Sequence, residues 1–360
     1  MTAPGGTPVT AVDVLVVGAG PIGLETAAVL QAEGRMVLVV DAGPVGATIA
    51  RTFPPDTRFF TSPERLAIRG WPVASTTGEK TTGEEYLAYL RALVSGLGLN
   101  VRTFTRVVAI DRTPGATGTP GDFTVRLLDN WVRTSAIACQ TIVLATGGTD
   151  APRMLGVPGE DLPGVHHELG DPHRFFGREV AVVGGRNSAA ETALRLYRVG
   201  ARVHLIHRAP HVHSRVKHWI RPEVESLLDE GELIRHMPTQ VVRFEPGRVI
   251  VSPLPAVPES HEYGIDVDDV VLQIGYEQDP GIFTLAGIPL VGEQSGPQHD
   301  PTTMESAVPG IFVVGTATAG TQARFDVFIE NSHQHADRVA AALAGRPAPA
   351  PVTARPLPES

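Results

Sequence analysis

The sequence predicts an α/β protein with two Rossmann-like, three-layer dinucleotide-binding domains, the second inserted into the first. An apolar strand, a glycine-rich turn, a helix and a second apolar strand occur in this order twice, with the turns beginning at Gly18 and Gly184. The 360 residues suffice for two domains of ordinary size. Gly and Pro cluster at residues 150–172 and 275–281, where an inserted domain would begin and end.

Val14–Val17 begins the first copy, and its continuous apolar character predicts a buried strand. Pro21–Glu33 predicts a helix, because proline suits a first helical turn and Gly34 can end the helix. Val37–Val40 then predicts the second strand of this copy.

Between the two copies, Glu84–Leu97 carries its leucines on one helical face and predicts an amphipathic helix. Val101–Arg112 and Phe123–Asn130 flank a Gly/Pro/Thr loop and predict a small antiparallel meander. Thr141–Gly148 follows as a buried strand that ends in glycines.

The second copy repeats the pattern with strand Val180–Val183, helix Ser188–Val199, Gly200 and strand Arg202–Ile206. A strand and a helix near the end of the chain would complete the first domain: Gly310–Val314 and Val327–Leu343. We therefore expect a discontinuous FAD domain formed by residues 11–152 and 278–345, and an inserted NADPH domain formed by residues 153–277. The ends of the chain, residues 1–10 and 346–360, are expected to be disordered.

The composition excludes several classes of protein. The net charge is −9 and no run of Lys or Arg occurs, so no nucleic acid partner is expected. No apolar stretch is long enough to cross a membrane, and no basic segment precedes the first apolar run, so we expect a cytoplasmic protein without a membrane partner. The single cysteine, Cys139, excludes an internal disulfide or redox dithiol.

The first glycine turn predicts a dinucleotide site with a free ribose. Gly18 permits the tight turn, Gly20 lets the backbone approach a pyrophosphate, and Gly23 lets helix and strand pack closely. Asp41 ends the next strand, where it can accept hydrogen bonds from a ribose 2′-OH. The turn consists of Gly18, Ala19, Gly20, Pro21, Ile22 and Gly23.

The second glycine turn predicts a site for a dinucleotide whose ribose carries a 2′-phosphate. It consists of Gly184, Gly185, Arg186, Asn187, Ser188 and Ala189. His207 and Arg208 stand where the first copy has its acid, and a cation at that place suits a 2′-phosphate, with Arg215 and Lys217 available to add to it. The alternative interpretation of Arg208 is a solvated surface charge.

Together the two sites predict FAD in the first, NADPH in the second, and hydride transfer between them. No side chain is assigned as catalytic, because the flavin would carry the reaction. No metal site is expected, since His207, His211 and His213 lack cysteine ligands and a coherent spacing.

Three segments resemble the two-dinucleotide flavoproteins around the low-molecular-weight thioredoxin reductases: residues 16–21, 142–147 and 310–315. Four more resemble the bacillithiol disulfide reductase family: residues 59–66, 184–189, 217–220 and 328–331. The resemblance implies that FAD is held by the first glycine turn together with Asp41, Thr48, Val107, Ala145, Thr146, Gly147, Gly315, Thr316 and the helix start near Val327. It places Thr61 and Ser62 beside the isoalloxazine, and it implies NADPH-dependent reduction of a small thiol disulfide by a homo-oligomer.

The chain departs from these families at three positions. Residues 165–176 contain no cysteine, whereas thioredoxin reductases carry a Cys-x-x-Cys there, which excludes a dithiol relay to thioredoxin. Ile22 stands where bacillithiol disulfide reductases commonly have a cysteine, and Thr316 replaces the superfamily's usual acid. Cys139 is expected on a strand as an inert, buried thiol.

Two alternatives to disulfide reduction remain from the sequence. One is an electron-transfer flavoprotein resembling ferredoxin or flavodoxin reductases, although the tail from Arg346 has no aromatic residue to stack on a flavin. The other is a redox sensor that binds FAD and NADPH without turnover. His333 and His335 lie two residues apart near the start of the last predicted helix. One of them could face the flavin and donate a proton, but a solvated or dimer-facing helix is the favoured interpretation.

Overall fold

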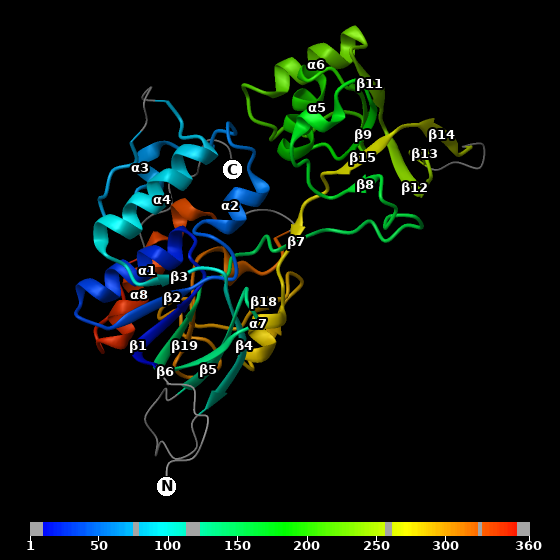
Figure 1. Cartoon of the computed structure of the whole chain (residues 1–360). Coiled ribbons are helices and arrows are strands. Elements are labelled where there is room, and N and C mark those ends of the chain that lie inside the picture. Colours follow the sequence, from blue (N-terminus) through cyan, green and yellow to red (C-terminus); the bar gives the residue numbers. More distant parts are fainter. Residues whose placement is uncertain (1–9, 75–78, 113–122, 256–260, 323–325, 351–360) are drawn as a thin grey trace. The chain divides into compact units, whose positions relative to one another are not determined.

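The computed structural model describes residues 10–74, 79–112, 123–255, 261–322 and 326–350 (Figure 1). These residues form two units: the chain up to Ala151 joins with the chain from Glu277 onward, and Pro152–Tyr276 forms the other. The segments predicted to be disordered lie mostly outside the described residues, and residues 346–350 carry neither helix nor strand. No helix in the described part of the chain is long and apolar enough to cross a membrane.

The first unit is built on a mixed sheet. Its strands run in the order β3-β2-β1-β6-β5-β4, and β19 also pairs with β6. The strands are β1 (Thr10–Val17), β2 (Val37–Val40), β3 (Val101–Arg102), β4 (Thr105–Arg112), β5 (Phe123–Asp129), β6 (Thr134–Leu144) and β19 (Ile311–Val313). The strands β3, β2, β1, β6 and β19 are parallel, whereas β4 and β5 form the antiparallel meander predicted from the sequence.

Two apolar layers enclose this sheet. On one face, Val14 and Val16 of β1 pack with helices α1 (Pro21–Ala32), α4 (Gly83–Leu97) and α8 (His333–Leu343). On the other face, Leu15 and Val17 pack with β4–β6 and α7 (Gly281–Leu285). The shorter elements are α2 (Ala47–Thr52), α3 (Pro63–Leu66), β17 (Leu290–Val291), β18 (Gly296–Pro297), η2 (Gly315–Ala319) and η3 (Ile329–Asn331).

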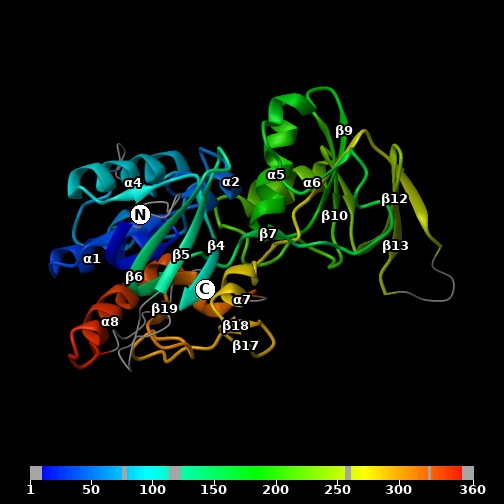
Figure 2. The ribbon, with the colours of Figure 1, turned by 60° about the horizontal axis from the view of Figure 1, so that its bottom comes forward.

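The second unit repeats the arrangement with a parallel sheet in the order β11-β10-β9-β15-β8. Helices α5 and α6 cover one face, and the antiparallel strands β12–β14 cover the other (Figure 2). The elements are β8 (Val165–His166), η1 (Pro172–Phe175), β9 (Glu179–Val183), α5 (Asn187–Arg198), β10 (Arg202–Ile206), α6 (Arg221–Glu230), β11 (Leu233–His236), β12 (Thr239–Glu245), β13 (Arg248–Pro253), β14 (Tyr263–Asp266) and β15 (Asp269–Leu272). The two chain segments that connect the units, β7 (Ala151–Pro152) and β16 (Tyr276–Glu277), pair with each other.

The last helix begins later than the sequence predicted. Val327 is not helical, because the side-chain amide of Gln322 satisfies both its N–H, at 2.9 Å, and its carbonyl, at 3.1 Å. A short 3₁₀ turn, η3, follows, and α8 begins only at His333. The predicted helix start near Val327 is therefore wrong, and a contact of Val327 with FAD stays a prediction.

Candidate functional site

The first glycine turn is tightly packed at two of its glycines. Gly18 has a φ of 112°, and a Cβ there would lie 2.4 Å from the carbonyl oxygen of Ala145. A Cβ on Gly23 would lie 2.0 Å from the Gly18 carbonyl oxygen. Any larger residue would push the start of α1 away from β1 and β6, so these two glycines fix the position of the helix.

Gly20 differs, because a Cβ there would meet no protein atom within 4 Å. It is the N-cap of α1, whose first turn has neither a side-chain cap nor an acidic residue. The helix therefore begins at an open surface with its N–H groups and the positive end of its dipole available, an arrangement that suits the diphosphate of a dinucleotide.

Asp41 closes the same turn from the end of β2. Its Oδ2 accepts a hydrogen bond from the Ala19 amide at 2.7 Å, and its Oδ1 accepts one from the Gly43 amide at 2.8 Å. Burial raises the pKa of the Asp41 carboxyl, although both amide hydrogen bonds oppose the rise. Each oxygen keeps a further lone pair, so the carboxylate fits the hydroxyls of a ribose.

Several of the predicted flavin residues come together beside this turn. Ile22 packs on Gly315, where a Cβ would lie 3.2 Å from the Ile22 Cβ, and a Cβ on Gly147 would lie 3.8 Å from the Thr316 hydroxyl. The Thr146 hydroxyl is buried and has no hydrogen-bond partner among the described residues. A buried hydroxyl without a partner is costly, so this group fits a ligand that supplies one.

The remaining predicted residues of the first unit are spread more widely. Thr48 lies on α2, whose N-cap Gly46 donates its amide to the Ala19 carbonyl. Thr61 is buried and Ser62 is the N-cap of α3. The Val107 side chain is buried in the core on the sheet face opposite α1.

His333 and His335 make contacts inside the first unit, so the expectation of a solvated helix face is wrong for these two side chains, while a dimer-facing helix stays a prediction. His333 Nδ1 lies 2.6 Å from Glu25 Oε2, and His335 Nδ1 accepts the Gly315 amide at 3.0 Å. Burial, with smaller contributions from Arg338 and neighbouring histidines, lowers the pKa of His335 to about 4, so its ring is neutral at pH 7. The buried residue Glu25 in the middle of α1 was the available sequence signal, since a buried carboxylate needs a partner.

The second glycine turn is shaped by a histidine ring. A Cβ on Gly185 would lie 2.4 Å from the ring of His207, so only glycine lets the ring lie over the backbone. Arg186 is the N-cap of α5 and is exposed. His213 donates its amide to the Gly185 carbonyl at 2.8 Å, which fixes the segment after β10 against the turn.

This turn carries a concentration of positive charge. Arg208 and Arg215 are exposed. Burial lowers the pKa of His207, and the charges of Arg208, His213 and Arg186 lower it further. Burial also lowers the pKa of His213, again aided by Arg186 and Arg215. The smaller contributions of the neighbouring charges to these shifts reflect a positive potential at the turn, which suits the extra phosphate of NADPH.

Lys217 lies elsewhere than predicted. Its side chain is buried and its ammonium pairs with Glu191 in the middle of α5. The backbone amide of Lys217 donates to Asn187 Oδ1 at 2.8 Å. Lys217 therefore holds the helix that carries the second turn, and the phosphate contact expected of its ammonium is not supported.

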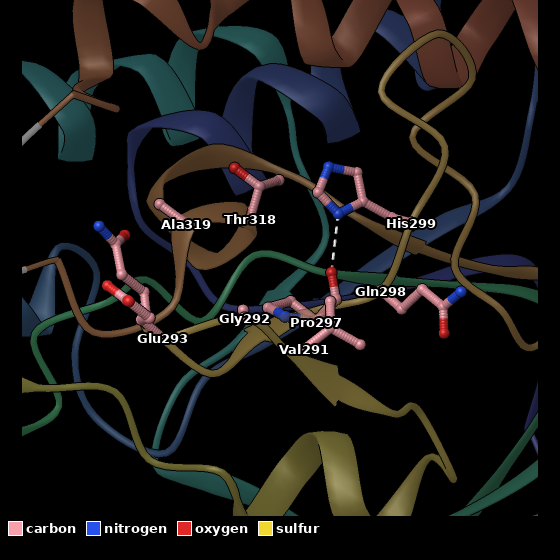
Figure 3. Close-up of a pocket in the computed structure, with 10 residues that line it drawn as sticks. Val291, Gly292, Glu293, Pro297, Gln298, His299, Thr318 and Ala319 are labelled. Carbon is pink, nitrogen blue, oxygen red and sulfur yellow. Dashed lines mark hydrogen bonds between the residues drawn. The ribbon is translucent and has the colours of Figure 1, made fainter.

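A cavity in the first unit lies apart from both glycine turns. This cavity of about 490 Å³ lies between the β17–β18 hairpin and the end of η2, and its lining includes Glu293, Gln298, His299 and Thr318 (Figure 3). None of its lining residues belongs to either glycine turn. Within the described ranges, no three His, Cys, Asp or Glu side chains come together in a way that could hold a metal ion.

Comparison with known proteins gives matches over most of the chain. Residues 15–315 match the family described as "Pyridine nucleotide-disulphide oxidoreductase". Bacilliredoxin reductase Bdr of Bacillus subtilis is 31% identical over 92% of this chain and 97% of its own length. A ferredoxin–NADP reductase of Leuconostoc citreum is 28% identical over 71% of this chain and 75% of its own. The solved structure of bacillithiol disulfide reductase Bdr from Bacillus cereus superimposes with a TM-score of 0.84 at 30% identity, covering 93% of this chain and 99% of that chain.

Proposed function

Since this chain belongs to the pyridine nucleotide-disulphide oxidoreductase family, we propose that it uses NADPH to reduce the disulfide of a small thiol of the bacillithiol type. The protein is a flavoprotein oxidoreductase that takes FAD and NADPH as its cofactors. We expect this enzyme to act in the cytoplasm as a homo-oligomer.

The different chemistry of the two glycine turns supports the assignment of the cofactors. In the first unit, the start of α1 would bind the diphosphate of FAD, and Asp41 would hold its ribose. In the second, Arg208 and Arg215 would hold the 2′-phosphate that distinguishes NADPH from NADH. FAD supplies a group that accepts a hydride and passes on two electrons.

The burial and the high pKa of Cys139 support the proposal that no thiol of the protein takes part in the reduction. It is the single cysteine of the chain, it is buried on β6, and burial raises its pKa to about 12. A thiol at this pKa carries almost no thiolate at pH 7 and cannot attack a disulfide. Reduction then consumes one NADPH and one proton from solvent and releases NADP⁺ and two thiols.

The decisive experiment is anaerobic stopped-flow. The flavin is reduced with one equivalent of NADPH, bacillithiol disulfide is mixed in, and the visible absorbance of the oxidised flavin is followed together with thiol release. We expect rapid recovery of the absorbance and two thiols per flavin. An absence of recovery would overturn the proposed substrate class.

A second function is favoured by one comparison. The similarity to a ferredoxin–NADP reductase extends over 71% of this chain, and such an activity needs no cysteine. If the disulfide fails and ferredoxin or flavodoxin then reoxidises the flavin, the protein is an electron-transfer reductase.

A further inference from the structure

Glu25 and His333 form a buried pair between the first and last helices of the first unit. Glu25 lies in the middle of α1, only four residues after Pro21, and its side chain is 6% exposed. His333 is the first residue of α8, and its Nδ1 lies 2.6 Å from Glu25 Oε2. A buried carboxylate this close to an imidazole favours the protonated ring.

The second ring nitrogen fixes the charge of His333. Its Nε2 lies 2.8 Å from the carbonyl oxygen of Arg65, and this oxygen can only accept a hydrogen bond. With Glu25 as a carboxylate, both nitrogens donate, and the ring is an imidazolium. Burial alone would lower the pKa of His333, but the hydrogen bond and charge of Glu25, with the Arg65 carbonyl, outweigh it and raise the pKa.

The pair also holds a third element. Arg65 belongs to α3, which directly follows Thr61 and Ser62. A second contact on the surface joins the same stretch to α8, where Arg69 lies 3.0 Å from Asp337. Residues 61–69 are therefore attached to α8 at two points, and the contact of His333, whose side chain is 24% exposed, is the less exposed of the two.

We propose that His333 is a positioning residue for the flavin: as an imidazolium it holds residues 61–65 against α1 and α8, and loss of its proton weakens the binding of FAD. This inference rests on the proposed function, which binds FAD at the first glycine turn, and on the expectation that Thr61 and Ser62 lie beside the isoalloxazine. The physical reason is that a neutral imidazole has only one N–H, so it cannot donate hydrogen bonds to both the Glu25 carboxylate and the Arg65 carbonyl.

The groups around the ring agree on the direction of the pH effect. Glu25 on α1 and Glu330 on η3 stabilise the charged form, whereas the neighbouring His335 is neutral at pH 7. Tyr86 and Tyr89 on α4 face Glu25 with pKa values raised above 10.0, so they stay uncharged. Glu25 is thus the main counter-charge, and its charge shifts the loss of the His333 proton to a higher pH than that of an ordinary imidazole.

The test is an FAD titration, followed by flavin fluorescence, of the full-length protein between about pH 6 and about pH 9.5. His333→Gln can still donate to the Arg65 carbonyl but does not titrate. Glu25→Gln keeps an acceptor for His333 but removes the charge. His299→Gln is the matched control, because this histidine lies in the same unit and donates to the Pro297 carbonyl, outside the pair.

We expect the wild type and His299→Gln to bind FAD about tenfold more weakly above the pKa of His333 than below it, the effect of one pKa unit of coupling. In Glu25→Gln the step moves to lower pH, and in His333→Gln it disappears. A step that survives in His333→Gln at the same midpoint, or a wild type without a step, would overturn the inference alone. A wild type that binds no FAD at any pH would overturn the proposed function and this inference with it.

Discussion

Glu25 and Glu191 occupy the same position in the two halves of the molecule. Each lies seven residues after the first glycine of its turn, in the helix that the turn begins, and each is buried. Each also pairs with a cation from a distant part of the chain, His333 for Glu25 and Lys217 for Glu191. The helix that follows each glycine turn, α1 or α5, is therefore anchored to a distant part of the chain by a charge pair.

Lys217→Met should destabilise the second unit by about 3–5 kcal/mol, because it leaves the Glu191 carboxylate in the interior without its ammonium. Urea unfolding is followed by the fluorescence of Trp219 in a Trp71→Phe/Trp131→Phe background, because those two tryptophans lie in the first unit. Lys217→Met/Glu191→Leu should recover part of the loss. Arg198→Met is the control, since its pair with Glu223 is about half exposed and should cost less than about 1 kcal/mol. Equal losses in the two single variants would contradict a buried ion pair.

Gly20→Ala should separate nucleotide binding from folding. A Cβ there meets no protein atom, so the unfolding free energy of the flavin-free protein should change by less than about 1 kcal/mol. The methyl group would occupy the approach to the diphosphate, so the dissociation constant of FAD should rise at least about tenfold. Gly23→Ala, whose Cβ would overlap the Gly18 carbonyl, should instead lower stability by about 2 kcal/mol or more.

Arg208→Ala should weaken NADPH by about 1–3 kcal/mol and leave NADH unchanged, because it removes a charge-assisted contact to the 2′-phosphate alone. Calorimetric titration of both coenzymes measures the difference. Arg91→Ala removes an exposed positive charge from α4 in the other unit and serves as the control. Wild-type protein that binds NADPH and NADH equally would refute the assignment.

Cys139→Ala should leave NADPH-dependent turnover within about twofold of the wild type, since a buried thiol with a pKa near 12 takes no part in the reaction. The cavity should cost about 1 kcal/mol of stability. Iodoacetamide should label the native protein slowly and the unfolded protein completely. Loss of activity at unchanged flavin content would show that Cys139 is catalytic after all.

Acid should destabilise the first unit through His335. Its pKa is 6.5 in an unfolded chain and about 4 in the fold, so the unfolded chain takes up the proton first as the pH falls. Stability is therefore complete above about pH 6.5 and falls by up to about 3 kcal/mol towards pH 4. His335→Asn keeps an acceptor for the Gly315 amide but does not titrate, so its unfolding free energy should fall less over this range. Parallel pH curves for the two proteins would rule this out.

Local sequence sufficed where the structure is determined locally. Val37–Val40 and Arg202–Ile206 form strands with the predicted bounds. Val37–Val40 is buried throughout, as a strand between parallel neighbours requires, whereas Arg202–Ile206 begins with an exposed arginine and is buried at Val203, Leu205 and Ile206. The glycine turns were identified because each directly follows an apolar strand and begins a helix, although the atoms that crowd Gly18 and Gly184 belong to Ala145 and Gln273, far away in the sequence.

Long-range pairing explains what the sequence did not show. Glu25 and His333 are 308 residues apart, and nothing in the sequence near either residue indicates the other. Lys217 was predicted at the phosphate because it follows the turn closely in sequence, while its burial depends on the packing of α5. The start of α8 was missed because a single side chain, Gln322, replaces the helical partners of Val327.

The long strand β6 pairs with a strand that is synthesised much later than itself. Its first half pairs with β5, but Ile142–Leu144 pair with β19, which a ribosome makes only after the whole of residues 152–276. The second unit can therefore finish folding while the first still lacks a strand. A chain released early would expose an apolar strand edge to other nascent chains, so this protein depends on being made to its end.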